Sequence, residues 1–175
     1  GIPSWLLREK DMQVRTKNKR FLAANEIYMK EVAKRLIPHQ INNGGNIIMV
    51  QVENEYGSFG DDHEYMKAVK ESIVNAGFTV PLFTSDGPGE NLLKGGTLPD
   101  VASVINFGSG DDPAKEFASF AKFRTGVPKM VGEYWVGWFD HWGEKHHTVK
   151  ADVVAKGVDY YIKNNISFNL YMFHG

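Results

Sequence analysis

The sequence predicts an α/β fold, in which apolar strands form a parallel sheet and helices cover it. Helical and strand patterns alternate along the 175 residues, without a long linker, a low-complexity tract or an internal repeat. Polar side chains gather just after the strands, as they do at the carboxyl ends of the strands in a (β/α)8 barrel. Neither GPGENL nor GSGDDP completes the glycine-rich phosphate-binding pattern expected in a doubly wound nucleotide-binding sheet. The barrel is therefore the favoured architecture.

Apolar periodicity predicts the approximate bounds of the elements, after an irregular segment over residues 1–20 whose basic stretch, 15–20, we expect to be a solvated loop. The expected elements in chain order are a helix over 22–37, a strand over 46–54, a helix over 62–76, strands over 80–84 and 101–107, a helix beginning at 112–113, a strand over 128–134, a helix over 148–163 and a strand over 167–173.

The helices are supported by apolar spacing and by residues that start or stop them. Helical spacing places apolar residues on one side of each helix: Ile27, Tyr28 and Val32 in the first, Tyr65, Met66, Val69 and Ile73 in the second, Phe117 and Phe120 in the third, and Val154, Val158 and Tyr161 in the fourth. Pro38 helps to end the first helix, and Gly77 suits the C-terminal cap of the second. Asp112 followed by Pro113 is a typical helix start.

The strands support a barrel because polar residues crowd their carboxyl ends. These residues are Glu53, Asn54, Glu55, Ser85, Asp86, Asn106, Glu133 and Tyr171. Five strands are too few to close an eight-stranded barrel. We therefore expect residues 1–175 to form a single partial (β/α)8 TIM-barrel domain that corresponds to the later strands of the fold.

Composition excludes several classes of function. Twenty basic and 21 acidic residues give a formal net charge of −1, so nothing favours a nucleic-acid partner or an anionic membrane surface. The aliphatic runs are far shorter than a membrane span requires. The absence of cysteine excludes disulfides, zinc–thiolate sites and cysteine nucleophiles within these residues. We expect neither nucleic acid nor membrane as a partner, and neither a metal nor a cofactor.

Two carboxylates, Glu55 and Glu133, end apolar strands that a barrel would bring to the same mouth. Glycoside hydrolysis needs such a pair, with one protonated acid for the leaving oxygen and one anion that attacks or activates water. The plain structural alternative is that each acid pairs with a basic residue at the rim. Aromatic residues that could pack on sugar rings follow Glu133 in EYWVGWFDHWG, although burial in the core is the commoner fate of tryptophan.

Several longer segments resemble signature segments of glycoside hydrolase family 35, the β-galactosidases. They are IIMVQVENEYGSFG, PLFTSDGP, MVGEYWVGWFDHWG and NLYMFHG, while GIPSWLL resembles the segment after the third barrel strand of that family. The resemblance covers nearly the whole chain. It implies that the chain represents roughly strands 4 to 8 of a (β/α)8 TIM barrel, with the intervening helices.

The resemblance also implies roles for individual residues. Glu55 falls on the acid/base of the family and Glu133 on its nucleophile, while Asn54, Trp138 and Tyr171 fall on substrate-binding positions. The family retains anomeric configuration, which requires the two carboxyl groups to lie ~5 Å apart. The implied substrate is a β-galactoside oligosaccharide or glycoconjugate with a terminal β-galactose. The implied compartment is secreted, periplasmic or lysosome-like.

Other interpretations remain open. A related exo-β-glycosidase such as a β-glucosaminidase is one, and a catalytically silent carbohydrate-binding fragment is another. A nucleotide-dependent oxidoreductase is disfavoured because no phosphate-binding loop is present. Glu53 is the nearest rival of Glu55, since alternate strand residues share a face, and we expect it to lie deeper with a partner. Asp86 and Asp140 are expected to cap turns or to pair with neighbours.

Overall fold

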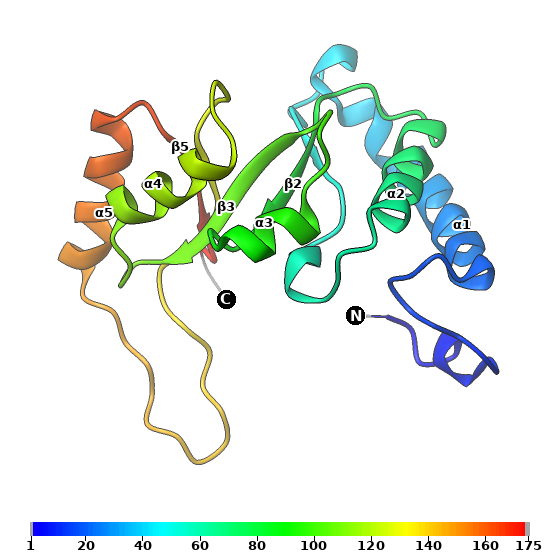
Figure 1. Cartoon of the computed structure of the whole chain (residues 1–175), viewed down its shortest axis with the longest axis horizontal. Helices are drawn as coiled ribbons and strands as arrows, with labels where there is room; N and C mark the ends of the chain where they lie inside the picture. The colour runs from blue at the N-terminus through cyan, green and yellow to red at the C-terminus, as the bar shows by residue number, and fades with distance from the viewer. Residues whose placement is uncertain (1, 174–175) are drawn as a thin grey trace.

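The computed structural model describes residues 2–173, which form a half-barrel of five parallel strands with helices between them (Figure 1). The sheet order β1-β2-β3-β4-β5 follows the chain, and each neighbouring pair is parallel. The strands are β1 (Val50–Gln51), β2 (Leu82–Asp86), β3 (Ala102–Gly108), β4 (Met130–Trp135) and β5 (Ser167–Tyr171). The helices are α1 (Lys19–Leu36), α2 (His63–Asn75), α3 (Glu90–Gly96), α4 (Pro113–Phe123) and α5 (Ala151–Lys163).

Most predicted elements are present, and side-chain caps set several helix starts. Asp112 accepts a hydrogen bond from the backbone amide of Ala114, and Pro113 is the first residue of α4, so the predicted start is confirmed. Asp62 caps α2 in the same way. The seven-residue helix α3 was not predicted, because it ends in Gly95 and Gly96 and is too short to show a helical period.

Of the apolar residues predicted to share one side of α1, Val32 packs against the core, whereas Ile27 and Tyr28 do not. Ile27 and Tyr28 are 67% and 62% exposed, whereas Phe21 and Ala33 are buried against the neighbouring elements. In the described residues, α1 is the first α-helix of the half-barrel, and the α-helix it packs against most is α2. Only one narrow side of the helix is therefore covered.

Two apolar clusters hold the helices onto the sheet. The first joins α1 and α2 to the residues around β1 and includes Val52, Met66 and Ile73. The second joins α4 and α5 to β3, β4 and β5. Its centre contains Tyr134 and Tyr161, whose rings meet edge-to-face at 5.1 Å. The helices therefore pack on one side of the sheet, and the strand ends remain open.

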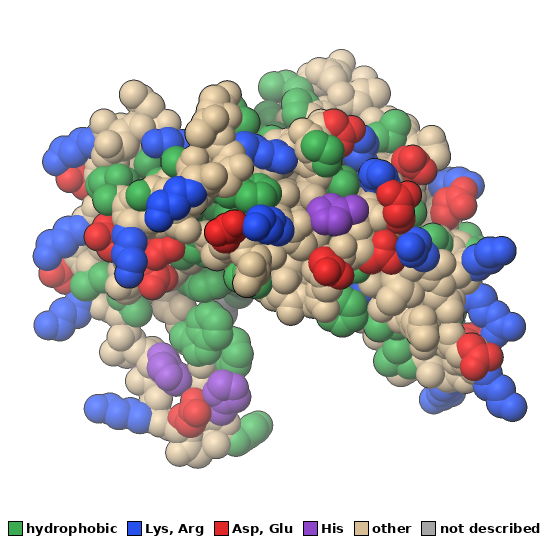
Figure 2. Space-filling view, viewed as in Figure 1, with side chains coloured by type: hydrophobic (Ala, Val, Ile, Leu, Met, Phe, Trp, Pro, Cys, Tyr) green, Lys and Arg blue, Asp and Glu red, His purple; other side chains and the backbone are tan. Residues whose placement is uncertain are grey.

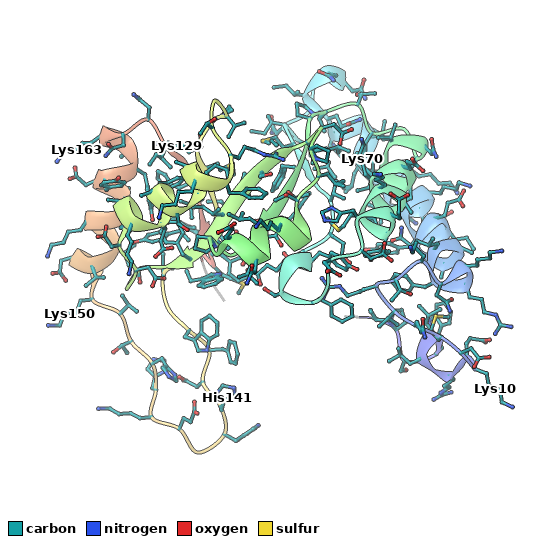
Figure 3. All side chains as sticks on the ribbon, in the orientation of Figure 1. Lys10, Lys70, Lys129, His141, Lys150 and Lys163 are labelled. Carbon is teal, nitrogen blue, oxygen red and sulfur yellow. The ribbon has the colours of Figure 1, made fainter. Side chains whose placement is uncertain are left out.

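The carboxyl ends of the strands lie at one edge of the molecule. Lys129, which precedes β4, lies at the edge opposite His141, which follows β4 on a projecting segment (Figure 3). The segment before α1 also projects at the edge that carries His141 (Figure 1). Loops from both halves of the chain thus gather where the strands end, the position of active sites in barrel enzymes.

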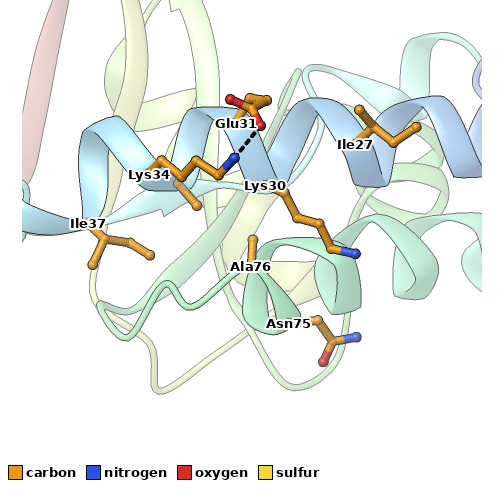
Figure 4. A pocket seen from close by; sticks show the side chains of 8 residues that line it. Ile27, Lys30, Glu31, Lys34, Ile37, Asn75 and Ala76 are labelled. Atoms are coloured by element: carbon orange, nitrogen blue, oxygen red, sulfur yellow. Dashed lines mark hydrogen bonds and ion pairs between the residues drawn. The ribbon is translucent and has the colours of Figure 1, made fainter.

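A shallow groove between α1 and α2 lies away from this edge (Figure 4). Its lining residues are Ile27, Lys30, Glu31, Ala33, Lys34, Ile37, Asn75 and Ala76. Most of them belong to the carboxyl-terminal parts of the two helices, which lead into the starts of β1 and β2. The groove therefore lies toward the opposite end of the sheet from the polar strand ends.

No helix among residues 2–173 is both long and apolar enough to cross a membrane.

Candidate active site

The backbone after β1 contains one more residue than the matching part of β2. Three backbone hydrogen bonds join these segments: Val50 N to Pro81 O, Val52 N to Phe83 O, and Glu55 N to Ser85 O. The step from Val52 to Glu55 covers three residues, while the step from Phe83 to Ser85 covers two, so the chain forms a bulge at Glu53. Glu53 and Glu55 have φ of 60° and 49°, a left-handed conformation that costs about 1–3 kcal/mol each.

The bulge separates the two glutamates that the strand pattern placed on one face. The carboxylate of Glu53 contacts Arg15 and Tyr65, and that of Glu55 turns to Asn106. The expectation that Glu53 has a partner is confirmed. The expectation that residues 15–20 are a solvated loop is wrong for Arg15, whose side chain is 24% exposed and forms an ion pair with Glu53.

Glu55 is held by a chain of neutral hydrogen bonds. Asn106, a buried residue of β3, donates from Nδ2 to Glu55 Oε1 at 3.0 Å. Ser85, a buried residue of β2, donates from Oγ to Asn106 Oδ1 at 2.6 Å. Because its oxygen accepts from Ser85, the amide nitrogen of Asn106 is the group turned toward Glu55. Three neighbouring strands thus contribute to the orientation of one carboxyl group.

Glu133 lies beside the same asparagine. In the pairing of β3 with β4, Asn106 is the Cα partner of Glu133. The indole Nε1 of Trp135 donates to Glu133 Oε2 at 3.0 Å, which fixes the second carboxyl group. Both predicted catalytic glutamates are half-buried and lie around Asn106 at the strand ends.

Gly132 makes room for this arrangement. A Cβ atom at this position would lie 2.5 Å from Ser85 Oγ and 2.8 Å from Asn106 Oδ1. Such distances are far below van der Waals contact, so any side chain would push apart the pair that orients Glu55. Gly132 therefore leaves room for Ser85 and Asn106, and also for Val104, whose Cγ2 would lie 2.6 Å from such a Cβ atom.

Asp86, at the end of β2, is a third carboxyl group close to the site. It is 1% exposed and accepts a hydrogen bond from the backbone amide of Gly57 at 2.8 Å. Burial raises the pKa of Asp86 to about 6, and the negative charges of Glu55 and Glu53 act in the same direction. Asp86 was expected to cap a turn or to pair with a neighbour; its hydrogen bond instead reaches Gly57, in the short helix η4 (Tyr56–Ser58).

The predicted substrate-binding residues Asn54, Trp138 and Tyr171 are all exposed. Asn54 is exposed in the bulge next to Glu55, and Tyr171 is the β5 partner of Trp135. Trp138 is 54% exposed and meets Trp135 edge-to-face at 5.8 Å. Trp138 also stacks on Phe139, so an aromatic surface begins beside Glu133 and continues into the loop.

The loop between β4 and α5 projects from the strand ends and carries a separate charged cluster. Asp140 accepts hydrogen bonds from Nδ1 of His146 and of His147, at 2.6 and 2.8 Å. These bonds hold the pKa of Asp140 far below its ordinary value, and Asp140 pairs with neighbours as expected. Figure 2 shows the histidines and acidic residues gathered on this projection. No group of three or more potential metal ligands among residues 2–173 is arranged to hold a metal ion.

The geometry provides two oriented carboxyl groups, a nearby amide and an exposed aromatic surface. Such a set can transfer a proton to a leaving oxygen and attack a sugar carbon, while the aromatic rings pack on the sugar. Sequence reasoning missed the hydrogen bonds of Arg15, Tyr65 and Trp135 to the glutamates, and it noted Asn106 only as a polar strand end. The contact of Asn106 with Glu55 depends on the pairing of β3 with its neighbouring strands, which the sequence alone does not reveal.

Comparisons with known proteins bear on the family and the fold of the chain. The model of Glycosyl hydrolases family 35 matches residues 1–175. A beta-galactosidase of Xanthomonas manihotis is 47% identical over 176 residues, covering 100% of this chain and 29% of that protein. Human beta-galactosidase-1-like protein 3 is 43% identical and human beta-galactosidase 36% identical, each covering 100% of this chain and 26% of the relative. The chain spans less than a third of the length of these relatives.

Solved structures show the fold. A beta-D-glucuronidase of Dictyoglomus thermophilum superposes with a TM-score of 0.62 at 15% identity, covering 93% of this chain and 31% of that chain. The GH53 catalytic domain of Ignisphaera aggregans superposes with a TM-score of 0.50 over 78% of this chain and 44% of that chain, also at 15% identity. The predicted TIM-barrel class is thereby confirmed, with the present residues forming half of the barrel.

Proposed function

Because the chain belongs to glycosyl hydrolases family 35, we propose that the complete protein is a retaining β-galactosidase that releases terminal β-galactose from β-galactosides. The observation that carries the proposal is the position of Asn106, which bonds to Glu55 and lies in register with Glu133. The names of the relatives supply the choice of galactose. Residues 1–175 are proposed to form part of one catalytic barrel domain.

The proposed reaction proceeds in two displacements. Ionised Glu133 attacks the anomeric carbon and forms a glycosyl ester, while protonated Glu55 gives its proton to the departing oxygen. Water then attacks the anomeric carbon as Glu55 takes up a proton from it, and Glu133 leaves as the carboxylate. Asn54 is proposed to bind the sugar 2-hydroxyl, and Trp138 and Tyr171 to line the galactose site.

Substitution of each glutamate separates the two roles. Glu133→Gln in the complete protein should abolish hydrolysis, because an amide does not form the ester intermediate. Glu55→Gln should spare the first step for aryl galactosides with good leaving groups, which depart without a proton, and should slow the second step. Steady-state and burst kinetics with two aryl galactosides measure both effects. A near-native rate for Glu133→Gln would refute the assignment.

Covalent trapping tests the chemistry and the sugar together. Incubation with 2-deoxy-2-fluoro-β-galactosyl fluoride, followed by intact mass and peptide mapping, should place one adduct on Glu133. Loss of the adduct in Glu133→Gln is the control. An adduct formed only with a 5-fluoro-β-glucosaminyl fluoride, which keeps the amino group at C2, would replace galactose by a neighbouring sugar. Galactoside binding without an adduct or hydrolysis would favour a silent carbohydrate-binding protein.

A further inference from the structure

Arg15 reaches the bulge from the segment that precedes α1. Its Nε donates to Glu53 Oε1 at 3.0 Å and its Nη2 to Glu53 Oε2 at 2.8 Å, a bidentate pair. The same Nη2 donates to the backbone oxygen of Asn54 at 2.8 Å. One guanidinium group therefore holds both a side chain and the main chain of the bulge.

Arg15 also contacts the chain on the other side of Glu55. Its guanidinium lies over the ring of Phe59 at 4.4 Å and near the ring of Tyr56 at 5.5 Å. Tyr56 follows Glu55 directly and is buried. The arginine is thus fixed to residues before and after Glu55, without contact to the Glu55 carboxyl group in the described interactions.

Glu53 transmits this support to Asn54. Its Oε2 accepts from the backbone amide of Asn54 at 2.8 Å, and its Oε1 accepts from the hydroxyl of Tyr65 at 2.5 Å. Burial acts to raise the pKa of Glu53, but the hydrogen bonds from Arg15 and Tyr65 outweigh it and hold the pKa below its ordinary value. An ionised, fully bonded carboxylate is a rigid support for the backbone beside it.

Gln51 completes the support by holding the side chain of Asn54. Its Nε2 donates to the backbone oxygen of Glu53 at 2.8 Å and to Asn54 Oδ1 at 2.9 Å. With its oxygen engaged, Asn54 presents its amide nitrogen as a donor for a sugar hydroxyl.

Unfavourable backbone conformations are concentrated in the bulge and in the arginine that contacts it. Five non-glycine residues among 2–173 have a positive φ, and three of them are Arg15, Glu53 and Glu55. Such conformations persist only where the surroundings hold them, and they gather at functional sites. We propose that Arg15 is a positioning residue, which acts through Glu53 to hold the bulge so that Asn54 and Glu55 are presented to the substrate. This proposal rests on the proposed galactosidase function.

Arg124 provides a matched control for a test in the complete protein. It also forms three hydrogen bonds through one guanidinium group, to Val101 O, Ser103 Oγ and Leu98 O. These acceptors lie before and at the start of β3, at the end of the sheet away from the site. Arg15→Lys and Arg124→Lys each keep the positive charge and lose the planar guanidinium group, which forms several hydrogen bonds at once. Both variants should lower the thermal-unfolding midpoint.

The two variants should differ in their dependence on the leaving group. With phenyl β-galactoside, whose departure needs a proton, Arg15→Lys should lower kcat/KM ~10- to 100-fold. With 2,4-dinitrophenyl β-galactoside, the loss should be about tenfold smaller, because Glu55 is not needed as an acid. Arg124→Lys should leave the ratio of the two kcat/KM values unchanged.

Three results would overturn the proposal in distinguishable ways. If Arg15→Lys lowers the unfolding midpoint but keeps the wild-type ratio, its role is structural and the galactosidase assignment stands. If Arg15→Lys does not fold, Tyr65→Phe removes a single hydrogen bond to Glu53 and should shift the ratio in the same direction; an unchanged ratio would then refute the proposal. If the unaltered protein hydrolyses neither substrate, the galactosidase function fails and the positioning role with it.

Discussion

Glu55 and Glu133 accept hydrogen bonds from neutral groups, whereas nearby Glu53 is ion-paired with Arg15. A cationic partner stabilises a carboxylate and opposes its protonation or loss of charge. A neutral amide or indole orients the carboxyl group with a much weaker preference for the anion. The neutral partners therefore suit groups that change charge during a reaction, and the ion pair suits a carboxylate with a fixed structural role.

Removal of the amide of Asn106 should disorient Glu55. Asn106→Ala in the complete protein is expected to lower kcat/KM for phenyl β-galactoside ~10- to 100-fold, because misplacement of a catalytic group by about 1 Å can cost ~100-fold in rate. Asn164→Ala, which removes an exposed hydrogen bond to Tyr160 O at the carboxyl end of α5, serves as the control. Native kinetics for Asn106→Ala would show that the bond to Glu55 is dispensable.

The buried carboxyl group of Asp86 should make stability depend on pH. Its pKa is raised from 3.8 to about 6 in the folded protein, so its protonated form stabilises the fold below pH ~4 and this stabilisation is lost as pH rises to ~6. The difference corresponds to about 3 kcal/mol. Asp86→Asn keeps an acceptor for the Gly57 amide and should remove the dependence.

Urea unfolding of the wild type and Asp86→Asn between pH 4 and 7 measures this difference. The unfolding free energy of the wild type should fall relative to the variant across that window. Parallel pH profiles would show that Asp86 is not shifted.

At the level of elements, the starts of two helices were predicted more closely than the regular part of the first strand. Capping by Asp62 and Asp112 depends on residues adjacent in sequence, so the sequence alone indicated these helix starts. The strand predicted over 46–54 is regular only at Val50–Gln51, because an apolar run does not reveal that an extra residue follows. The bulge becomes apparent only when β1 is paired with β2.

In the candidate site, too, local features were predictable from the sequence and long-range contacts were not. The two glutamates were predictable, since each one follows an apolar strand and matches a family segment. Their partners were not. Arg15 meets Glu53 across 38 residues of sequence, and Asn106 meets Glu55 across 51, so both contacts depend on the assembled sheet. A basic residue in a loop and a polar residue in a strand have many commoner fates.

The order of the loop between β4 and α5 should depend on Asp140. Asp140 accepts from two imidazoles and from the backbone amide of His147, so it joins the two sides of the loop. Asp140→Ala should increase hydrogen exchange over residues 137–149 and leave the exchange of the strands unchanged. Lys145→Ala, in the same loop, is the control. Equal protection in wild type and Asp140→Ala would show that another contact holds the loop.

At the scale of the molecule, the half-barrel leaves unpaired strand edges in the described residues. β1 and β5 are the outer strands of the sheet, and Ser167, Asn169 and Tyr171 alternate as exposed residues along β5. Exposed parallel edges and an open inner face favour association with other chains. The isolated 175-residue chain therefore presents surfaces that a closed barrel would cover.

The isolated chain should differ measurably from the complete protein. We expect stronger binding of a hydrophobic dye and concentration-dependent self-association in sedimentation experiments, because the sheet edges are free. Labelling of Glu133 by the fluorinated galactosyl fluoride should be slower in the isolated chain than in the complete protein. A monomeric isolated chain with native labelling would show that the half-barrel is sufficient for both folding and chemistry.

The bulge at Glu53 makes the site sensitive to chain length as well as to residue type. In a regular strand, one residue more or less turns every later side chain to the opposite face. Deletion of one residue between Val52 and Glu55 would retain the carboxylate in the sequence and direct it away from Asn106. In the evolution of this strand, an insertion or deletion would therefore create or remove the orientation of Glu55 in one step, without any substitution of the glutamate itself.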